Sequence, residues 1–309
     1  MTERFAAIDL GSNSFRLEAG HFIGRRFISE KYIKETVRLA GGLTVEGALS
    51  KKIQEKALIA LYGFSMVIKG MDPDCVKAVG TQALRCATNA ANFIGQAEKV
   101  LGHRIEIISG QEEGRLVFKG CACTLPPSSE TRLVIDIGGA STELVLGRGG
   151  NVLRSDSFPL GSVNMSARFF GDGLLSEERF CQAMACARRI FDPEAHRFGR
   201  PLWDHAYGSA GTIGAVELLA RSENWGSAIS EEVLAHALRA FSEAGCVTRL
   251  NFRGLKPDRR DIIPGGLAIL CALFKSLGLQ RLETAAGSLR YGLLFELLEN
   301  WQSMHKQNV

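Results

Sequence analysis

Two segments of this chain share an order of residues that suits phosphate chemistry. In residues 8–14 and 135–142, an apolar run ends at an aspartate, Asp9 or Asp136, and then turns through glycine and hydroxyl side chains. Glycine lets the backbone bend and expose N–H groups that bind phosphate oxygens, while a carboxylate at a strand end can hold a hydrated divalent cation. Two such copies indicate duplicated domains facing one cleft. The alternative is two unrelated hairpin turns with capping aspartates.

Polar groups within these turns are the candidates for holding phosphate. They are Ser12, Asn13 and Ser14 in the first turn, and Gly138, Gly139, Ser141 and Thr142 in the second. A third glycine-containing turn, residues 208–212, follows a strand-like run and opens a helix, so its backbone amides could face a ligand. Gly208, Gly211 and Thr212 are therefore further candidates.

The elements that must position these turns alternate along the first half of the chain. The patterning predicts strands over 5–8, 15–19, 27–33, 76–79 and 105–108, and helices that begin after Ser50 and Asn89. This order, three strands followed by two helix–strand units, favours helices layered on a mixed sheet. Glu112 and Glu113 lie in the first turn of a further helix, where acidic side chains complement the helix dipole.

The run Pro126-Pro127-Ser128-Ser129 is the clearest break in the chain, and it divides two predicted domains, 1–125 and 126–309. The second domain begins with the repeated motif. Helices are expected over 177–191 and 231–244, with a strand over 205–208 between them. An apolar stripe at helical spacing from Leu289 to Trp301 predicts a last helix that could cross back onto the first domain.

Composition narrows the class of protein. With 309 residues, 46% of them hydrophobic, the chain is long enough for two ordered domains. A net charge of +4 does not suggest a nucleic-acid binder, although Arg253, Lys256, Arg259 and Arg260 form either a local site for a polyanion or a solvated loop. The eight cysteines lack zinc-site spacing, and no signal peptide or membrane span is expected. A cytoplasmic location is predicted.

At this point the chain resembles the Ppx/GppA family of exopolyphosphatases and guanosine pentaphosphate phosphatases, within the actin, sugar-kinase and heat-shock chaperone superfold. The matching segments are residues 7–15, 80–85, 105–113, 134–143 and 264–270. The resemblance implies an α/β fold of two actin-like (ribonuclease H-like) domains with the active site in the cleft between them. It also implies hydrolysis of a terminal phosphoanhydride in polyphosphate or pppGpp, assisted by Mg²⁺ or Mn²⁺.

The resemblance also assigns roles to individual residues. Glu113 matches the catalytic glutamate of the family, and a cleft could raise its pKa towards the working pH. Asp9 and Asp136, with Glu143 as a third carboxylate, are expected to gather the metal ion, because hard oxygen ligands suit Mg²⁺. Arg85, and further Arg16 and Arg38, would bind successive anionic groups. For Arg16 a solvent-facing strand position, and for Arg38 the start of a turn, are equally open.

The chain departs from the family pattern at several positions. Ala140 stands where a third glycine is usual, Ala286 replaces an acidic residue before Gly287 and Arg290, and the third turn reads Gly-Ser-Ala-Gly-Thr. The first change is expected to be tolerated, whereas the others put nucleotide-like binding in doubt. The extra helical domains that follow this core in long family members are not expected in this chain, which would leave a shorter surface for a long polymer.

Two other functions remain open from the sequence. The same loops would serve an ATP-dependent kinase of a small acceptor, or a sensor that binds nucleotide or polyphosphate and responds by closing its cleft without turnover. A kinase would need a catalytic aspartate and an acceptor site, and no constellation of that kind is evident. The expected partner is a polyanionic phosphate substrate, without nucleic acid or membrane. Monomer and homodimer both remain open.

Overall fold

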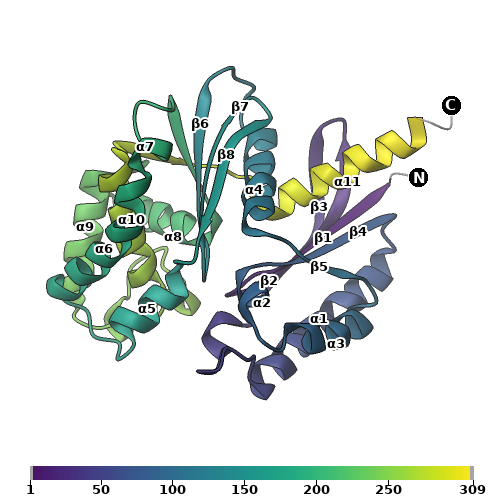
Figure 1. Ribbon diagram of the computed structural model, residues 1–309, viewed down its shortest axis with the longest axis horizontal. Helices are drawn as coiled ribbons and strands as arrows, with labels where there is room; N and C mark the ends of the chain where they lie inside the picture. Colours follow the sequence, from purple (N-terminus) through teal and green to yellow (C-terminus); the bar gives the residue numbers. More distant parts are fainter. Residues whose placement is uncertain (1–2, 307–309) are drawn as a thin grey trace.

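The computed structural model describes residues 3–306, which form two α/β lobes (Figure 1). The sheet of the first lobe has five strands in the order β3-β2-β1-β4-β5. Their bounds are β1 Arg4–Leu10, β2 Phe15–Ile23, β3 Arg26–Glu35, β4 Cys75–Gly80 and β5 Ile105–Ile107. The first three strands form an antiparallel meander, and β4 and β5 run parallel to β1. The predicted mixed sheet is confirmed.

Four helices accompany this sheet. They are α1 Lys51–Met71, α2 Gln82–Cys86, α3 Ala90–Leu101 and α4 Gly110–Thr124. The side chains of Phe64 and Phe93 place α1 and α3 in one buried cluster with Ile8 and Leu17 of the sheet. The predicted order of strands and helices holds, with α2 as an addition. Asn89 precedes α3 as expected, but its side chain does not cap the helix and instead bonds the backbone of Leu49 at 2.8 and 3.0 Å.

The second lobe repeats the mixed-sheet design. Its strands, in the order β10-β11-β9-β6-β7-β8, are β6 Thr131–Ile137, β7 Thr142–Arg148, β8 Asn151–Phe158, β9 His205–Ser209, β10 Ile229–Ser230 and β11 Arg281–Thr284. Its helices are α5 Ser162–Phe170, α6 Glu177–Phe191, α7 Ala195–Phe198, α8 Ala210–Ser222, α9 Glu231–Ala244 and α10 Ile263–Leu277. Because β6 pairs antiparallel with β7 and parallel with β9, Asp136 lies one residue before the end of a central strand, as Asp9 does in β1.

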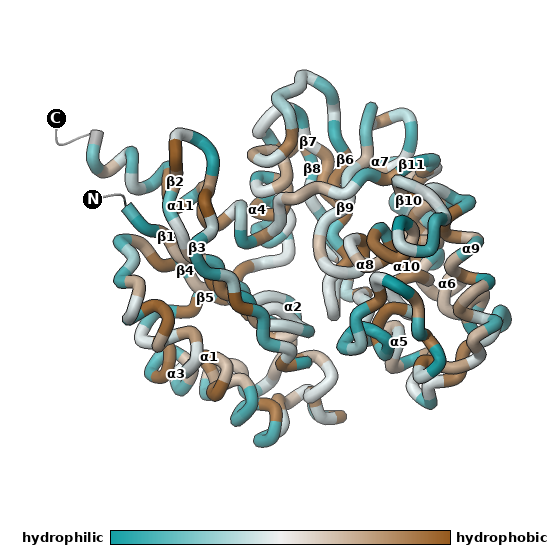
Figure 2. The backbone as a smooth tube through the Cα atoms, turned by 180° about the vertical axis from the view of Figure 1, so that it is seen from behind, coloured by the Kyte–Doolittle hydropathy of each residue, from teal (hydrophilic) through white to brown (hydrophobic). Residues whose placement is uncertain are grey.

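The core of the second lobe forms around α10, which is hydrophobic along most of its length (Figure 2). Its side chains share one buried cluster with those of α6, α9 and the sheet. Short 3-10 turns complete the lobe, among them η4 Pro257–Arg259, which immediately precedes α10 in the chain. Within residues 3–306, α10 included, the chain has no helix whose length and apolar character would let it traverse a bilayer.

The last helix, α11 Leu289–Lys306, packs along α4 and over β1 and β4 of the first sheet (Figure 1). The two helices meet at backbone contact distance. A Cβ atom on Gly292 would lie 2.0 Å from the carbonyl oxygen of Leu116, and one on Gly120 would lie 2.1 Å from that of Ser288. Only glycine therefore fits at this crossing. The domain boundary at 125/126 stays a prediction.

Gly292→Ala should lower the free energy of unfolding by about 3 kcal/mol, because the new methyl group overlaps backbone that has no room to retreat. Urea unfolding followed by circular dichroism measures this change. Gly95→Ala on α3 is the matched control, since a Cβ at that position meets nothing within 4 Å. The control should gain about 1 kcal/mol from helix propensity. Equal behaviour of the two variants would contradict the tight crossing.

Candidate active site

A cleft of about 390 Å³ separates the two lobes, and both repeated motifs line it. From the first lobe the lining includes Asp9, Ser12, Asn13, Ser14, Arg16 and Glu113, and from the second it includes Asp136, Gly138, Gly139, Ser141, Gly211 and Thr212. These residues come from positions far apart in the sequence. The fold therefore brings most of the predicted site residues to one place.

The first turn is held in shape by its own backbone and by the elements around it. A Cβ on Gly11 would approach the carbonyl oxygen of Ser14 to 2.9 Å, so the turn needs glycine there. The Ser12 hydroxyl accepts a hydrogen bond from the backbone N–H of Ala83 at the start of α2 (3.1 Å). Asn13 Oδ1 is buried and has no hydrogen-bond partner within the described residues. An unpaired buried acceptor of this kind calls for a water or ligand donor.

The second turn approaches the first across the cleft. A Cβ on Gly139 would lie 3.1 Å from the backbone nitrogen of Asn13, which places the two loops almost in contact. The loop is closed by the N–H of Gly138, which donates to the carbonyl of Ser141 at 2.9 Å. Ala140 adopts no left-handed φ, so its side chain fits without backbone strain. The expected tolerance of this substitution has a structural reason.

Glu113 lies in the first turn of α4 and reaches the cleft. Ser109 caps this helix, its hydroxyl accepting from the N–H of Glu112 at 3.1 Å. The Glu113 carboxylate accepts a hydrogen bond from Arg85 Nη1 at 2.8 Å, and Arg85 is itself anchored to the carbonyl of Ile108 and to Gln82. Glu112 points elsewhere, towards Arg115, as the 100° step between neighbouring helix positions requires.

Burial raises the pKa of Glu113 to about 7, and the opposing effect of Arg85 is too small to cancel it. The nearby carboxylates of Asp136 and Asp9 add to the rise. Burial likewise raises the pKa of Asp136 to about 6, with Arg16 opposing and Asp9 contributing. Several largely buried carboxyl groups thus line one cleft, an arrangement that favours a bound cation and a proton acceptor near neutral pH.

Comparison with known proteins identifies the family of this chain. A model of the Ppx/GppA phosphatase family matches residues 26–301. The chain belongs to the Ppx/GppA phosphatase family. It is 38% identical over 296 residues to a guanosine-5'-triphosphate,3'-diphosphate pyrophosphatase of Aeromonas hydrophila, and this match covers 96% of the chain. The Ppx/GppA chain described here spans about 60% of the length of the curated relatives it matches.

Solved structures give the same assignment. A Ppx/GppA family member from Aquifex aeolicus superposes with a TM-score of 0.81 at 26% identity, over 97% of this chain and 99% of that one. An exopolyphosphatase from Cytophaga hutchinsonii superposes with a TM-score of 0.86 at 22% identity, over 96% of this chain and 98% of that one, which shows the shared fold. The predicted fold class, two actin-like α/β lobes, is confirmed.

Some predicted site residues of this Ppx/GppA chain do not line the cleft. Thr142 is fully buried and donates to the carbonyl of Leu160 at 2.6 Å, while a Cβ on Gly208 would clash with Ile213. Thr142 and Gly208 therefore lie behind the lining of the cleft, in the interior of the second lobe. Arg85 does not line the cleft either, and its link to the cleft is its hydrogen bond to Glu113.

Arg38 and Glu143 also lie outside the lining. Arg38 has a left-handed φ of 67° and pairs with Asp261 of the other lobe at 3.2 Å. Glu143 is 1% exposed and accepts from the Ser157 hydroxyl at 2.6 Å. Burial raises the pKa of Glu143 well above its usual value, and the charges of Glu113 and Asp136 contribute. Glu143 therefore interacts electrostatically with the cleft carboxylates without lining the cleft, whereas Asp9 and Asp136 line it.

Arg259 of η4 is a cleft residue whose orientation the sequence did not reveal. Its guanidinium lies against the glycine turn, since a Cβ on Gly211 would be 1.9 Å from Arg259 Nη2. Its neighbour Asp258 pairs instead with Lys34 at 2.8 Å, and within residues 3–306 no carboxylate forms an ion pair with Arg259. Burial lowers the pKa of Arg259, and the nearby Arg16 lowers it further. In the sequence, the feature that pointed to Arg259 was the basic run 253–260.

Two other positions bear on the departures from the family pattern. Ala286 lines the cleft, where the pattern has an acid, and Arg290 beside it bonds Glu18 of the first lobe through Nε at 3.1 Å. In the third turn Ala210 holds a left-handed φ of 65°, a conformation that strains a residue with a side chain. Ala210 lines the cleft, and strained backbone conformations are often found at functional sites.

Proposed function

We propose that this Ppx/GppA phosphatase hydrolyses the terminal phosphoanhydride of a polyanion, either inorganic polyphosphate or pppGpp. The observation that carries the proposal is the Glu113 carboxylate, which is buried in the lining of the same cleft as the two glycine turns and has a pKa raised to about 7. A carboxylate with this pKa can accept a proton near neutral pH, which is what activation of a water molecule requires.

In this proposal the two turns hold the phosphate that is transferred. Backbone N–H groups and hydroxyls of residues 12–14 and 138–141 would bind its oxygens, and the close approach of Gly139 to Asn13 would surround one phosphate from both lobes. The remaining phosphates would extend towards Arg16 and Arg259, whose guanidinium groups suit bidentate binding of phosphate oxygens. Arg259 forms no ion pair within residues 3–306, and the substrate would supply a direct anionic partner.

The donor set in the cleft fits a magnesium ion. Asp9 and Asp136 are 4% and 8% exposed and both line the cleft; Asp9 accepts a hydrogen bond from Arg16 at 3.1 Å, and its charge helps to raise the pKa of Asp136. Within residues 3–306 there is no cluster of three or more acidic, histidine or cysteine side chains arranged around one point. Mg²⁺ commonly takes one or two carboxylates and completes its shell with water and phosphate oxygens. When bound, it would neutralise charge on the phosphate oxygens.

The hydrolytic step then follows from the placement of Glu113. A water molecule between Glu113 and the terminal phosphate gives a proton to the carboxylate while its oxygen bonds to phosphorus. The bridging P–O bond on the opposite side breaks, and the electron pair leaves with the shortened chain. Arg85 would hold the Glu113 side chain in position, and the cations along the cleft would stabilise the negative charge that moves onto the leaving oxygen.

Phosphate release from purified protein and Mg²⁺ tests this function. Tripolyphosphate, long-chain polyphosphate, pppGpp and ATP are supplied separately, and free phosphate is measured over time. The name of the Aeromonas relative supports including pppGpp. We expect release from at least one of the first three, because each offers a terminal anhydride on an extended anion. Release from none of them, or from ATP alone, would reject the assigned reaction.

A further inference from the structure

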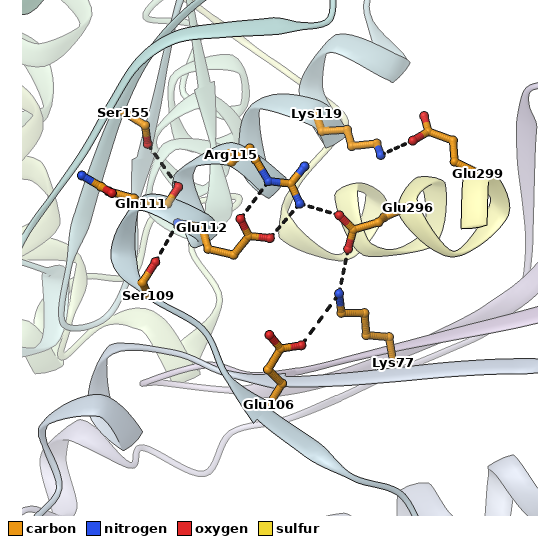
Figure 3. Close-up of polar contacts among 10 residues, drawn as sticks. All are labelled: Lys77, Glu106, Ser109, Gln111, Glu112, Arg115, Lys119, Ser155, Glu296 and Glu299. Atoms are coloured by element: carbon orange, nitrogen blue, oxygen red, sulfur yellow. Dashed lines mark hydrogen bonds and ion pairs between the residues drawn. The ribbon is translucent and has the colours of Figure 1, made fainter. Parts of the chain in front are cut away.

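A cluster of four charged side chains ties the start of α4 to the last helix and to the first sheet (Figure 3). We call Glu112, Arg115, Glu296 and Lys77 the α4–α11 ion-pair cluster. Arg115 bonds both oxygens of Glu112, at 2.8 Å through Nε and 2.7 Å through Nη2, and also bonds Glu296 of α11. The second oxygen of Glu296 accepts from Lys77 of β4 at 2.7 Å.

Glu296 is the centre of this cluster. Its side chain is only 16% exposed and lies between two cations, Arg115 from α4 and Lys77 from the sheet. Burial works against its ionisation, but hydrogen bonds from Lys77 and Arg115 outweigh that effect and lower the pKa of Glu296. The carboxylate is therefore charged at neutral pH and bridges the two elements. Ion pairs that are partly buried and linked in a network hold geometry better than isolated surface pairs.

The glycine crossing and the ion-pair cluster hold α4 at different points along its length. Where Gly120, Gly287 and Gly292 bring the two backbones into contact, apolar side chains of both helices pack beside them in one buried cluster. These contacts fix how closely the helices approach, but hydrophobic burial is non-directional. Farther towards the start of α4, the cluster supplies directional contacts. It therefore adds a directional restraint on the rotation of α4 about its own axis.

This rotation matters because Glu113 is next to Glu112 on the same turn. The partner of Glu113, Arg85, is anchored to Gln82 and Ile108 of the first lobe, independently of α4. A small rotation of α4 would therefore change the distance between Glu113 and Arg85 and move the carboxylate relative to the glycine turns. General-base catalysis depends steeply on such distances.

We propose that Arg115 and Glu296 are positioning residues that hold α4 so that Glu113 faces the terminal phosphate. This inference rests on the proposed function of Glu113 and adds to it a pair of residues that do not line the cleft. They act through the helix, without touching substrate. The polar contacts of Figure 3 thus connect α11 to the first turn of α4, the turn that also carries Glu113.

Glu296→Gln tests the inference, because it keeps the shape of the side chain and removes its charge. We expect kcat with the best substrate to fall roughly tenfold while KM stays near the wild-type value. Arg115→Gln should lower kcat to a similar extent. The double variant should have a kcat no lower than that of the less active single variant, since the two residues act as a unit. Arg115→Lys, which keeps the charge, should recover part of the loss.

Lys119→Met is the matched control. Lys119 lies one turn further along α4 and pairs with Glu299 of α11 at 2.6 Å. Its replacement therefore also removes an α4–α11 ion pair, but one that lies farther from Glu113 along the helix. All variants are assayed well below their thermal midpoints, with the folded fraction measured by circular dichroism. Wild-type kcat in Glu296→Gln, a loss that follows only the folded fraction, or an equal loss in Lys119→Met would each overturn the inference. Activity that disappears in Glu113→Gln but persists in Glu296→Gln would overturn the positioning role alone.

Discussion

Replacement of Glu113 by glutamine should lower kcat for phosphate release by about 10²- to 10⁴-fold, the usual contribution of a positioned general base. Glutamine keeps the size of the side chain and can still receive a hydrogen bond from Arg85, so the fold and the binding of substrate should persist. It cannot accept the proton of the attacking water. Steady-state kinetics should therefore show a loss in kcat with little change in KM.

Glu112→Gln is the natural comparison, because the two glutamates are adjacent on α4 but point in different directions. The Glu112 carboxylate contacts Arg115 and not the cleft, so its replacement should cause a far smaller loss. The proposed chemistry fails if Glu113→Gln turns over substrate at the wild-type rate, or if the two variants lose the same activity. Substrate binding measured by calorimetry separates a lost base from a lost binding site.

The pH dependence of wild-type activity is a second test of Glu113 as the general base. Burial raises the pKa of Glu113 to about 7, so kcat/KM should rise as pH increases through that value and the carboxylate loses its proton. The charges that face Glu113 act in both directions: Arg85 lowers its pKa, while Asp136 and Asp9 raise it. Arg85→Met should consequently move the acid limb of the profile to higher pH.

The architecture could be predicted from the sequence where the signal is local. Alternating or continuous apolar runs bounded by glycine and aspartate marked β1 and β6, and Ser230 caps α9 as its position suggests. The five-residue α2 is too short to show a helical period. In α10 almost every residue is apolar, so periodicity could not distinguish a buried helix from a strand.

The site was predictable to the extent that it is contiguous in the sequence. Each glycine turn lies within one short segment, and a strand that ends at an aspartate directs that turn to one edge of its sheet. Thr142 was misleading because it is the first residue of β7, where its hydroxyl faces the interior and bonds Leu160. Arg259 and Lys34 reach the cleft only because the lobes close on one another, which no local pattern records.

Arg259→Met should raise KM by about 10- to 100-fold and leave kcat much less affected. A charged hydrogen bond to phosphate contributes about 1.5–3 kcal/mol, which corresponds to that range. The same change should not destabilise the free protein, because a half-buried cation that forms no ion pair within residues 3–306 is itself unfavourable. Weaker binding together with an unchanged or higher thermal midpoint is the combined result expected from a residue that is kept for its ligand.

Arg260→Met is the matched control for charge. Arg260 is the next residue, carries the same guanidinium and bonds Asn251 at 3.0 Å, but it does not line the cleft. If Arg259 binds a phosphate directly, only its replacement raises KM strongly. If the basic loop attracts the substrate merely through long-range charge, both variants raise KM equally, and the increase fades at high salt because distant charges are screened. Equal effects that fade with salt would therefore contradict a direct contact at Arg259.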